Sequence, residues 1–261
     1  MELTPVTDPA VVARALDDAH LEGRTLAAPA LAVGDLASAY DVQRALTARR
    51  LARGGRVVGW KLGYTSLVMR EQMGIEAPNF GPLLSSMVLD EGVIGPGFTQ
   101  PRVEPEIALV LARDPGAGAG VDDVLAATSS ARAALEVVDS VWSGYAFDLE
   151  HNTADGSSAA GVVLGAELPL DGLPDLTVTL LVDGAVVGEG AGRDAGGHPA
   201  SGVAWLAARL AERGEALRPG DVVITGGLTA AAPVRPGSSV HARFRARAAD
   251  VGEVRARRFA R

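Results

Sequence analysis

The stretch "VEPEIALVL", residues 103–111, decides the fold and raises a question about its two acids. The apolar run after Glu106 predicts a buried strand. Because side chains alternate across a strand, Glu104 and Glu106 point to one face, followed there by Ala108 and Val110. We expect this face to become core. Unpaired carboxylates would be strongly disfavoured there, so a positive partner is predicted, either Arg or Lys or a metal ion.

A third acid lies in a similar setting. Glu136, in "AALEVVDSV", shares a face of another predicted strand with Ala134 and Val138. One interpretation places Glu104 and Glu106 at the exposed mouth of their strand, paired with nearby arginines, Arg102 or Arg56. The other groups the three acids around a hard divalent cation, Mg²⁺ or Mn²⁺, with open positions for water and substrate.

Lys61 is the second unusual residue. It lies in the predicted strand "VVGWKLGYTS" between Gly59 and Gly63, so its own face of the strand is nearly bare and is expected to be open to a ligand. The alternative is a lysine that extends to solvent. Beside a metal-carboxylate site, Lys61 would act as a proton donor or would hold an anion.

Composition narrows the class of protein. The 261 residues carry a formal net charge of -8 and are 48% hydrophobic, with no cysteine and four histidines. The negative charge argues against nucleic-acid binding, and the absence of cysteine excludes disulfides and thiolate metal sites. No apolar run is long enough to span a membrane, and the N-terminus lacks the pattern of a secretion signal. We expect a soluble, cytoplasmic protein that binds a small molecule.

The order of predicted elements indicates an α+β fold. Helices are predicted over 9–23, 34–55 and 66–74, followed by a turn-rich segment at 76–86. Most of the remaining chain predicts strands, interrupted by helices at 120–128 and 198–214, and Asp183-Gly184 predicts a type I′ hairpin. We therefore divide the chain into an N-terminal, mainly helical region, 1–84, that carries the Lys61 strand, and a β-rich catalytic domain, 85–261, with the metal site.

An ordered set of segments carries a family resemblance over about residues 39–258. They are "VVGWKLGYTSLVMREQMGIEAPNFGPLL", "PRVEPEIALVLARD", "ALEVVDS", "TADGSSAAGVVLG" and "GHPASGVAWLAARLAERGEALRPGDVVITGGLT". Together they resemble the 2-keto-4-pentenoate hydratase and 4-oxalocrotonate decarboxylase branch of the fumarylacetoacetate hydrolase superfamily. The resemblance implies a mixed β-sandwich roll with a small helical N-terminal region, and homo-oligomers.

The resemblance also implies roles for individual residues. Glu104, Glu106 and Glu136 would hold the divalent metal, Lys61 would be an active-site residue, and Ser157 or Ser158 would lie near the substrate. Two positions depart from the family pattern. Asn79 stands where the hydratases usually have Asp, and unlike Asp it cannot transfer a proton. Gly156 stands where the family usually has Asn, so a polar contact is expected to be lost there.

The resemblance implies a metal-dependent lyase on 2-oxo-4-enoates. We expect first a hydratase that converts 2-hydroxypenta-2,4-dienoate-type substrates to 4-hydroxy-2-oxo acids. A decarboxylase of 2-oxo-3-enedioates is the alternative, and "DSVWSGYAFDL" resembles the decarboxylase version of that segment slightly more. Hydrolysis of an acylpyruvate ranks lower, because it normally requires a histidine base upstream of the first metal ligands to activate water. His20 is the only histidine upstream, and it lies in a predicted helix remote from every motif. A non-catalytic homologue is the last alternative.

Overall fold

The computed structural model describes residues 8–67, 70–71, 74–247 and 249–259. Its α-helices are α1 (Pro9–Glu22), α2 (Leu36–Leu51), α4 (Val121–Ala127), α5 (Leu149–Ala154) and α6 (Pro199–Ala211). Short 3-10 helices lie at Ala28–Ala30, Ser85–Met87, Asp90–Gly92, Ser143–Tyr145, Leu173–Asp175 and Gly192–Asp194.

Within the described residues the strands form two sheets. The larger has the order β2 (Asn79–Leu84), β1 (Val57–Gly63), β9 (Val222–Ile224), β4 (Arg102–Leu111), β5 (Thr128–Val138), β6 (Ala159–Leu168), with β10 (Ala232–Pro233) paired to β4. The smaller has the order β3 (Val93–Ile94), β12 (Ala249–Arg258), β11 (Ser239–Ala246), β7 (Thr177–Val182), β8 (Ala185–Ala191).

Strand β4, which carries Glu104 and Glu106, is covered on both faces. Val103, Ile107 and Leu109 face the main core, which the larger sheet shares with the smaller sheet and with α6. Glu104 and Glu106 point to the opposite face, where Ala108 belongs to a separate, smaller apolar cluster. The expectation that the acids lie on a face that becomes core is therefore confirmed, although the cluster on that face is the smaller of the two. Both faces of this sheet are covered, so alternation alone could not tell which face carries the larger core.

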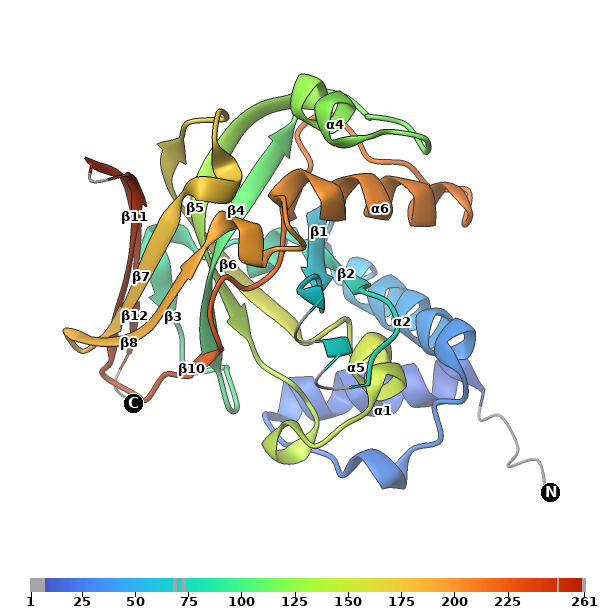
Figure 1. The fold of residues 1–261 in the computed structure, drawn as a ribbon. Helices are drawn as coiled ribbons and strands as arrows, with labels where there is room; N and C mark the ends of the chain where they lie inside the picture. The colour runs from blue at the N-terminus through green and yellow to red at the C-terminus, as the bar shows by residue number, and fades with distance from the viewer. Residues whose placement is uncertain (1–7, 68–69, 72–73, 248, 260–261) are drawn as a thin grey trace.

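The helices gather at one side of the sheets. In Figure 1, α1, α2 and α5 lie together below β1 and β2, whereas β7, β8, β11 and β12 form the opposite side of the molecule. A second core cluster joins α1, α2 and α5 around the fully buried Trp142. The start of α1 follows its sequence signal, since the Asp8 side chain accepts a hydrogen bond from Ala10 N at 2.9 Å.

Most predicted elements are present, and the α+β sandwich is confirmed. At the predicted hairpin, Asp183 and Gly184 have φ of 52° and 79°, as a type I′ turn requires. The segment 76–86 differs from expectation, because Asn79–Leu84 is strand β2 rather than a loop. It lies at the edge of the sheet, where a proline such as Pro82 is tolerated.

Two predicted elements near the site end early or fall partly outside the described residues. The predicted strand that carries Glu136 ends at Val138, and the side chain of the next residue, Asp139, accepts hydrogen bonds from Thr99 N and Gln100 N, each at 2.7 Å. The helix expected at 66–74 falls partly on residues 68–69 and 72–73, outside the described residues. The division of the chain at residue 84 stays a prediction. Among the described residues, no helix is both long and apolar enough to cross a membrane.

Candidate metal and substrate site

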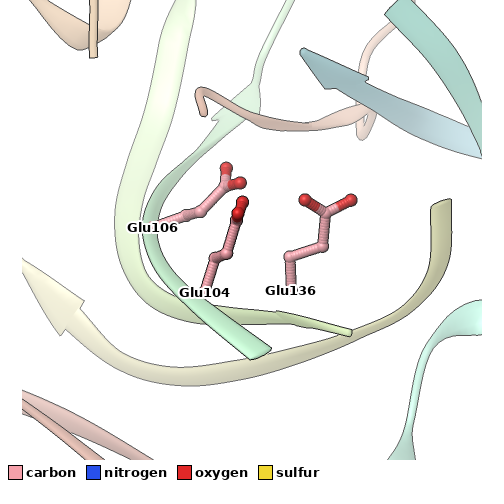
Figure 2. A group of neighbouring side chains, drawn as sticks. All are labelled: Glu104, Glu106 and Glu136. Atoms are coloured by element: carbon pink, nitrogen blue, oxygen red, sulfur yellow. The ribbon is translucent and has the colours of Figure 1, made fainter. Parts of the chain in front are cut away.

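Three glutamates converge where β4 and β5 lie side by side. Glu104 is directly opposite Glu136 in the antiparallel ladder, and Glu106 lies two residues farther along the same face. One carboxylate oxygen from each residue lies within 4.8 Å of the other two. Figure 2 shows the three side chains pointing into one common space.

The acids lack the partners that burial demands. Glu106 and Glu136 are fully buried, and Gly226 N donates to Glu106 Oε2 at 2.7 Å. Glu106 Oε1 and both oxygens of Glu136 have no hydrogen-bond partner. Neither Arg102 nor Arg56 forms an ion pair with these acids in the part of the chain that the structure describes, so the predicted alternative of arginine pairing is not formed. Unpartnered carboxylate oxygens that face one another fit a hard divalent cation.

Without a cation, the closeness and burial of the three glutamates shift their pKa values. Burial raises the pKa of all three carboxyls. The neighbouring Glu136 adds to this effect at Glu104, whose pKa rises to about 7, and at Glu106, whose pKa lies well above its usual range. The three groups therefore resist ionising together until a positive charge joins them.

Lys61 supplies the nearest positive charge. Its side chain is buried, and its Nζ donates to the Ser157 carbonyl at 2.8 Å and lies 3.3 Å from Glu136 Oε2. Burial alone would lower the pKa of Lys61, but the three glutamates outweigh it, Glu136 most, and the pKa is raised. Lys61 is thus a held ammonium ion, and the alternative of a lysine reaching into solvent is wrong.

The glycines beside Lys61 make room for protein rather than for a ligand. A Cβ on Gly59 would lie 1.9 Å from the Val222 carbonyl oxygen, and one on Gly63 would lie 2.2 Å from Asn79 Oδ1. The bare face predicted for Lys61 is therefore filled by neighbouring residues, and only Lys61 and Gly63 of this face reach the cavity.

Ser157 and Ser158 lie at the site in a strained turn. Both have left-handed backbone, with φ of 58° and 56°, directly after Gly156 at 81°. Their hydroxyls are engaged, because Ser157 Oγ donates to Asn79 Oδ1 at 2.8 Å and Ser158 Oγ accepts from Asn152 Nδ2 at 2.9 Å. The turn presents the Ser157 carbonyl to Lys61.

Asn79 is placed behind the site rather than in it. It is fully buried, and its amide donates to Asn152 Oδ1 and to Thr153 Oγ1, each at 2.9 Å. With Ser157 Oγ donating to its oxygen, the Asn79 side chain is fully paired. Its geometry is that of a residue that positions Ser157.

A cavity of about 440 Å³ opens beside these groups. Glu104, Lys61 and both serines line it, and so does Arg102, which lies on the same face of β4 as Glu104. The Arg102 guanidinium stacks over the ring of Tyr145 at 4.2 Å from the ring centroid.

The Tyr145 hydroxyl fixes that ring. It lies 3.0 Å from the Gln100 carbonyl and 3.0 Å from the Val138 carbonyl. Sequence reasoning did not single out Tyr145, whose only signal was the segment "DSVWSGYAFDL".

A glycine pair that sequence reasoning passed over also shapes the site. Gly226 donates to Glu106, and a Cβ on Gly227 would lie 2.6 Å from Glu104 Oε2. The double glycine after the short strand "VVI" was the available signal, because glycine in such a place marks a close approach to the backbone.

The sequence suggested that His20 lies remote from every motif, but the structure places it beside Asp155 of the segment "TADGSS". Its Nε2 lies 2.6 Å from Asp155 Oδ1, although 135 residues separate the two. It lines a different cavity from Glu104, so it is still not placed as a base at the acids.

Comparison with known proteins places this geometry in a family. The family model described as "Fumarylacetoacetate (FAA) hydrolase C-terminal" matches residues 58–257. The chain belongs to the fumarylacetoacetate hydrolase family. This confirms the resemblance seen in the sequence.

The similar curated proteins include both decarboxylases and hydratases. The chain is 42% identical to the 4-oxalocrotonate decarboxylase of Pseudomonas sp. (strain CF600) over 80% of this chain and 81% of that protein. It is 40% identical to the 2-keto-4-pentenoate hydratase of Burkholderia vietnamiensis (strain G4 / LMG 22486), over 84% of this chain and 87% of that protein.

A solved member of the family has the same fold. The 4-oxalocrotonate decarboxylase from Pseudomonas putida G7, complexed with magnesium and adipate, superposes with a TM-score of 0.88 at 35% identity, covering 96% of this chain and 97% of that one. The chain is thus an enzyme of the family's lyase branch, which includes hydratases and decarboxylases.

Proposed function

We propose that this family member is a Mg²⁺-dependent lyase that acts on 2-oxo-enoates. The convergence of three glutamates with unpartnered buried oxygens beside a held ammonium is the observation that carries the proposal. Glu104, Glu106 and Glu136 would hold the ion, since an all-oxygen set suits magnesium. The Pseudomonas putida G7 enzyme, solved with magnesium, supports this choice.

The bound ion would supply positive charge that stabilises an enolate oxygen developing on the substrate. The protein's own groups would orient the substrate beside it. Lys61 lines the cavity beside the glutamates, and its ammonium is suited to hold the substrate's carboxylate. Ser157 fixes Lys61 through its carbonyl, and Asn79 fixes Ser157.

Decarboxylation of a 2-oxo-3-enedioate is the reaction that the geometry supports best. Such a substrate carries a second carboxylate, and the Arg102 side chain lines the cavity without an ion-pair partner among the described residues. Arg102 and Glu104 are two residues apart on one strand face, about 7 Å along the strand. This spacing suits the two ends of a six-carbon diacid. The adipate in the Pseudomonas putida G7 complex, also a diacid, supports the same assignment.

In this reaction the bond between the distal carboxylate and its carbon breaks. The carboxylate leaves as CO₂, and the bonding electrons pass along the conjugated chain to the 2-oxo oxygen, which gives a 2-hydroxy-2,4-dienoate after protonation. Arg102 would select and orient the diacid, and Lys61 would hold its other end.

Hydration of a 2-hydroxypenta-2,4-dienoate, the first expectation from the sequence, is the second candidate. The 40% identical hydratase supports it. Against it, Asn79 carries no acidic proton and its amide is fully engaged, so this position offers no group to move a proton to or from water. The expected cytoplasmic location and homo-oligomeric assembly remain part of the proposal.

Product analysis tests the choice. The magnesium-loaded protein is mixed with 2-oxohex-3-enedioate and, separately, with 2-hydroxypenta-2,4-dienoate, and CO₂ and 4-hydroxy-2-oxopentanoate are followed. We expect CO₂ from the diacid, no CO₂ with Glu106→Gln, and a raised KM for the diacid with Arg102→Met. Hydroxy acid without CO₂ would establish the hydratase instead. No product from either substrate would contradict the lyase proposal.

A further inference from the structure

A second cavity lies behind the site, between the helical side of the molecule and the larger sheet. It has a volume of about 580 Å³. Basic side chains from α1 and from the end of α2 form one wall: His20, Arg50 and Arg53. Apolar side chains form much of the other: Leu84, Met87, Phe98 and Ala159. The carboxyls of Asp17 and Asp139 also line the cavity, and Asp139 accepts hydrogen bonds from two backbone N–H groups, of Thr99 and Gln100. The cavity thus combines basic side chains, two engaged acids and an apolar wall.

Arg50 is the cation that the protein leaves without a partner there. Asp17, the nearest acid on α1, is taken by Arg49 and Arg53. The Arg50 side chain is partly buried and forms no hydrogen bond or ion pair with any residue that the structure describes. A guanidinium stays charged in proteins and carries five N–H donors in a planar fork. Among the described residues these donors have no acceptor, and Arg50 lines the cavity.

The other acid near Arg50 is also already occupied. Asp155 Oδ1 pairs with His20 Nε2 at 2.6 Å, and Asp155 Oδ2 accepts from Val141 N at 3.0 Å and from Ser140 Oγ at 3.2 Å. Both Asp155 and Asp17 are buried and draw on Arg50 only at longer range. The positive charge of Arg50 is thus available to an anion from outside the chain.

The two cavities lie back to back. Val138 lines the substrate cavity, and the next residue, Asp139, lines the second one. The same alternation occurs at Ser158 and Ala159. The second cavity is thus separated from the substrate cavity by the β5 and β6 ends, and it is a different site from the one described above.

We propose that this second cavity binds a small organic carboxylate, with Arg50 as its anchor. The planar fork of Arg50 matches a carboxylate bidentately, and the apolar wall suits the hydrocarbon body that such an anion carries and that inorganic phosphate lacks. His20, at the rim, would face the anion and also holds Asp155, the residue before the turn that fixes Lys61. The site does not depend on the reaction proposed above.

Calorimetry with isovalerate, a branched monocarboxylate, tests the site in the Glu106→Gln protein, which is expected not to hold magnesium, so that isovalerate cannot bind at the metal. Because isovalerate can also enter the substrate cavity, the Glu106→Gln protein serves as the background for every variant. We expect saturable binding that Arg50→Met weakens at least tenfold and that Arg50→Lys, which keeps the charge but loses the fork, weakens severalfold. Arg44→Met, at an exposed arginine of the same helix that pairs with Asp41, is the matched control and should bind as the background does.

Three results would overturn the proposal. Equal affinity in the Arg50→Met and Arg44→Met proteins would remove Arg50 from the site. Tighter binding of inorganic phosphate than of isovalerate would contradict the ligand class. A change of oligomeric state in Arg50→Met, measured by light scattering, would assign Arg50 to a contact between subunits. If Arg50→Met does not fold, the comparison of Arg50→Lys with Arg44→Met decides in the same way.

Discussion

Two groups of buried acids in this molecule have opposite surroundings. Asp17, between α1 and α2, is fully buried, and Arg53 binds its two oxygens at 2.7 and 2.8 Å while Arg49 adds a third contact at 2.9 Å. Glu106 and Glu136 are buried to the same extent, but three of their four oxygens have no hydrogen-bond partner. The acids are equally buried but differ in hydrogen bonding. Asp17 is paired and links the helices, whereas the glutamates have free oxygens that can bind a ligand.

The two groups of acids differ in what their burial costs in folding free energy. An acid that meets two guanidinium groups regains in hydrogen bonds much of what it loses in hydration. Three carboxylates beside a single ammonium do not, so the folded protein keeps them there at a cost in stability. Such a cost is typical of a functional site, because the missing charge can be supplied by a bound cation.

The largest effect is expected from breaking the glutamate group. Glu106→Gln removes a charged ligand, and the loss of several kcal/mol of transition-state stabilisation should lower kcat/KM by about a thousandfold or more. Steady-state rates in saturating Mg²⁺ measure this. Glu167→Gln, at an exposed position on β6, is the control and should be unaffected. A Glu106→Gln enzyme within tenfold of the original would refute the assigned role.

Mg²⁺ should stabilise the folded protein only when the glutamate group is intact. At about one hundred times its Kd, Mg²⁺ should raise the free energy of unfolding by about 2.7 kcal/mol, which corresponds to a Tm several degrees higher. Thermal unfolding with and without Mg²⁺ measures the shift. Asp17→Asn should keep the shift, and Glu106→Gln should lose it. A shift of equal size in both variants would mean that the cation binds elsewhere.

Removing the paired acid should affect folding and leave the chemistry intact. Asp17→Asn leaves Arg49 and Arg53, which are 36% and 43% exposed, partly hydrated, so we expect a loss of about 1–3 kcal/mol in the free energy of unfolding. Urea unfolding measures it. Turnover of the folded variant at low temperature should match that of the original protein. A large loss of activity with unchanged stability would contradict the structural role of Asp17.

The smallest expected effect is a pH dependence of the stability that Asp17 contributes. Burial alone would raise the pKa of Asp17, but hydrogen bonds from Arg53 and Arg49 outweigh it and the pKa is lowered. A carboxyl whose pKa is lower in the folded state stabilises the fold above its unfolded pKa, roughly 4, and loses this contribution as the pH falls through the folded pKa. The stability gap between the original protein and Asp17→Asn should therefore shrink below about pH 4. A gap that widens on acidification would contradict the assignment.

The sequence predicted the glutamate group better than its surroundings. Alternation along β4 placed Glu104 and Glu106 on one face, and the predicted grouping of these acids with Glu136 agrees with their convergence in the structure. The same alternation could not show that the acids face away from the main core. Burial of both faces leaves no difference in pattern between them.

Other features had no local signal. Asn79–Leu84 contains residues typical of turns, and it forms a strand only because the neighbouring strand β1 pairs with it. The contact of His20 with Asp155 joins residues far apart in the chain, as does the contact of Asp17 with Arg53. Such contacts depend on how the helices pack, which propensity and periodicity do not determine.

Magnesium binding measured by calorimetry tests the central claim most directly. The account predicts that the original protein and Asp17→Asn each bind a single Mg²⁺ ion per chain with similar affinity, and that Glu106→Gln shows no measurable binding. Undiminished binding in Glu106→Gln, or loss of binding in Asp17→Asn alone, would contradict the claim that the unpartnered glutamates form the cation site.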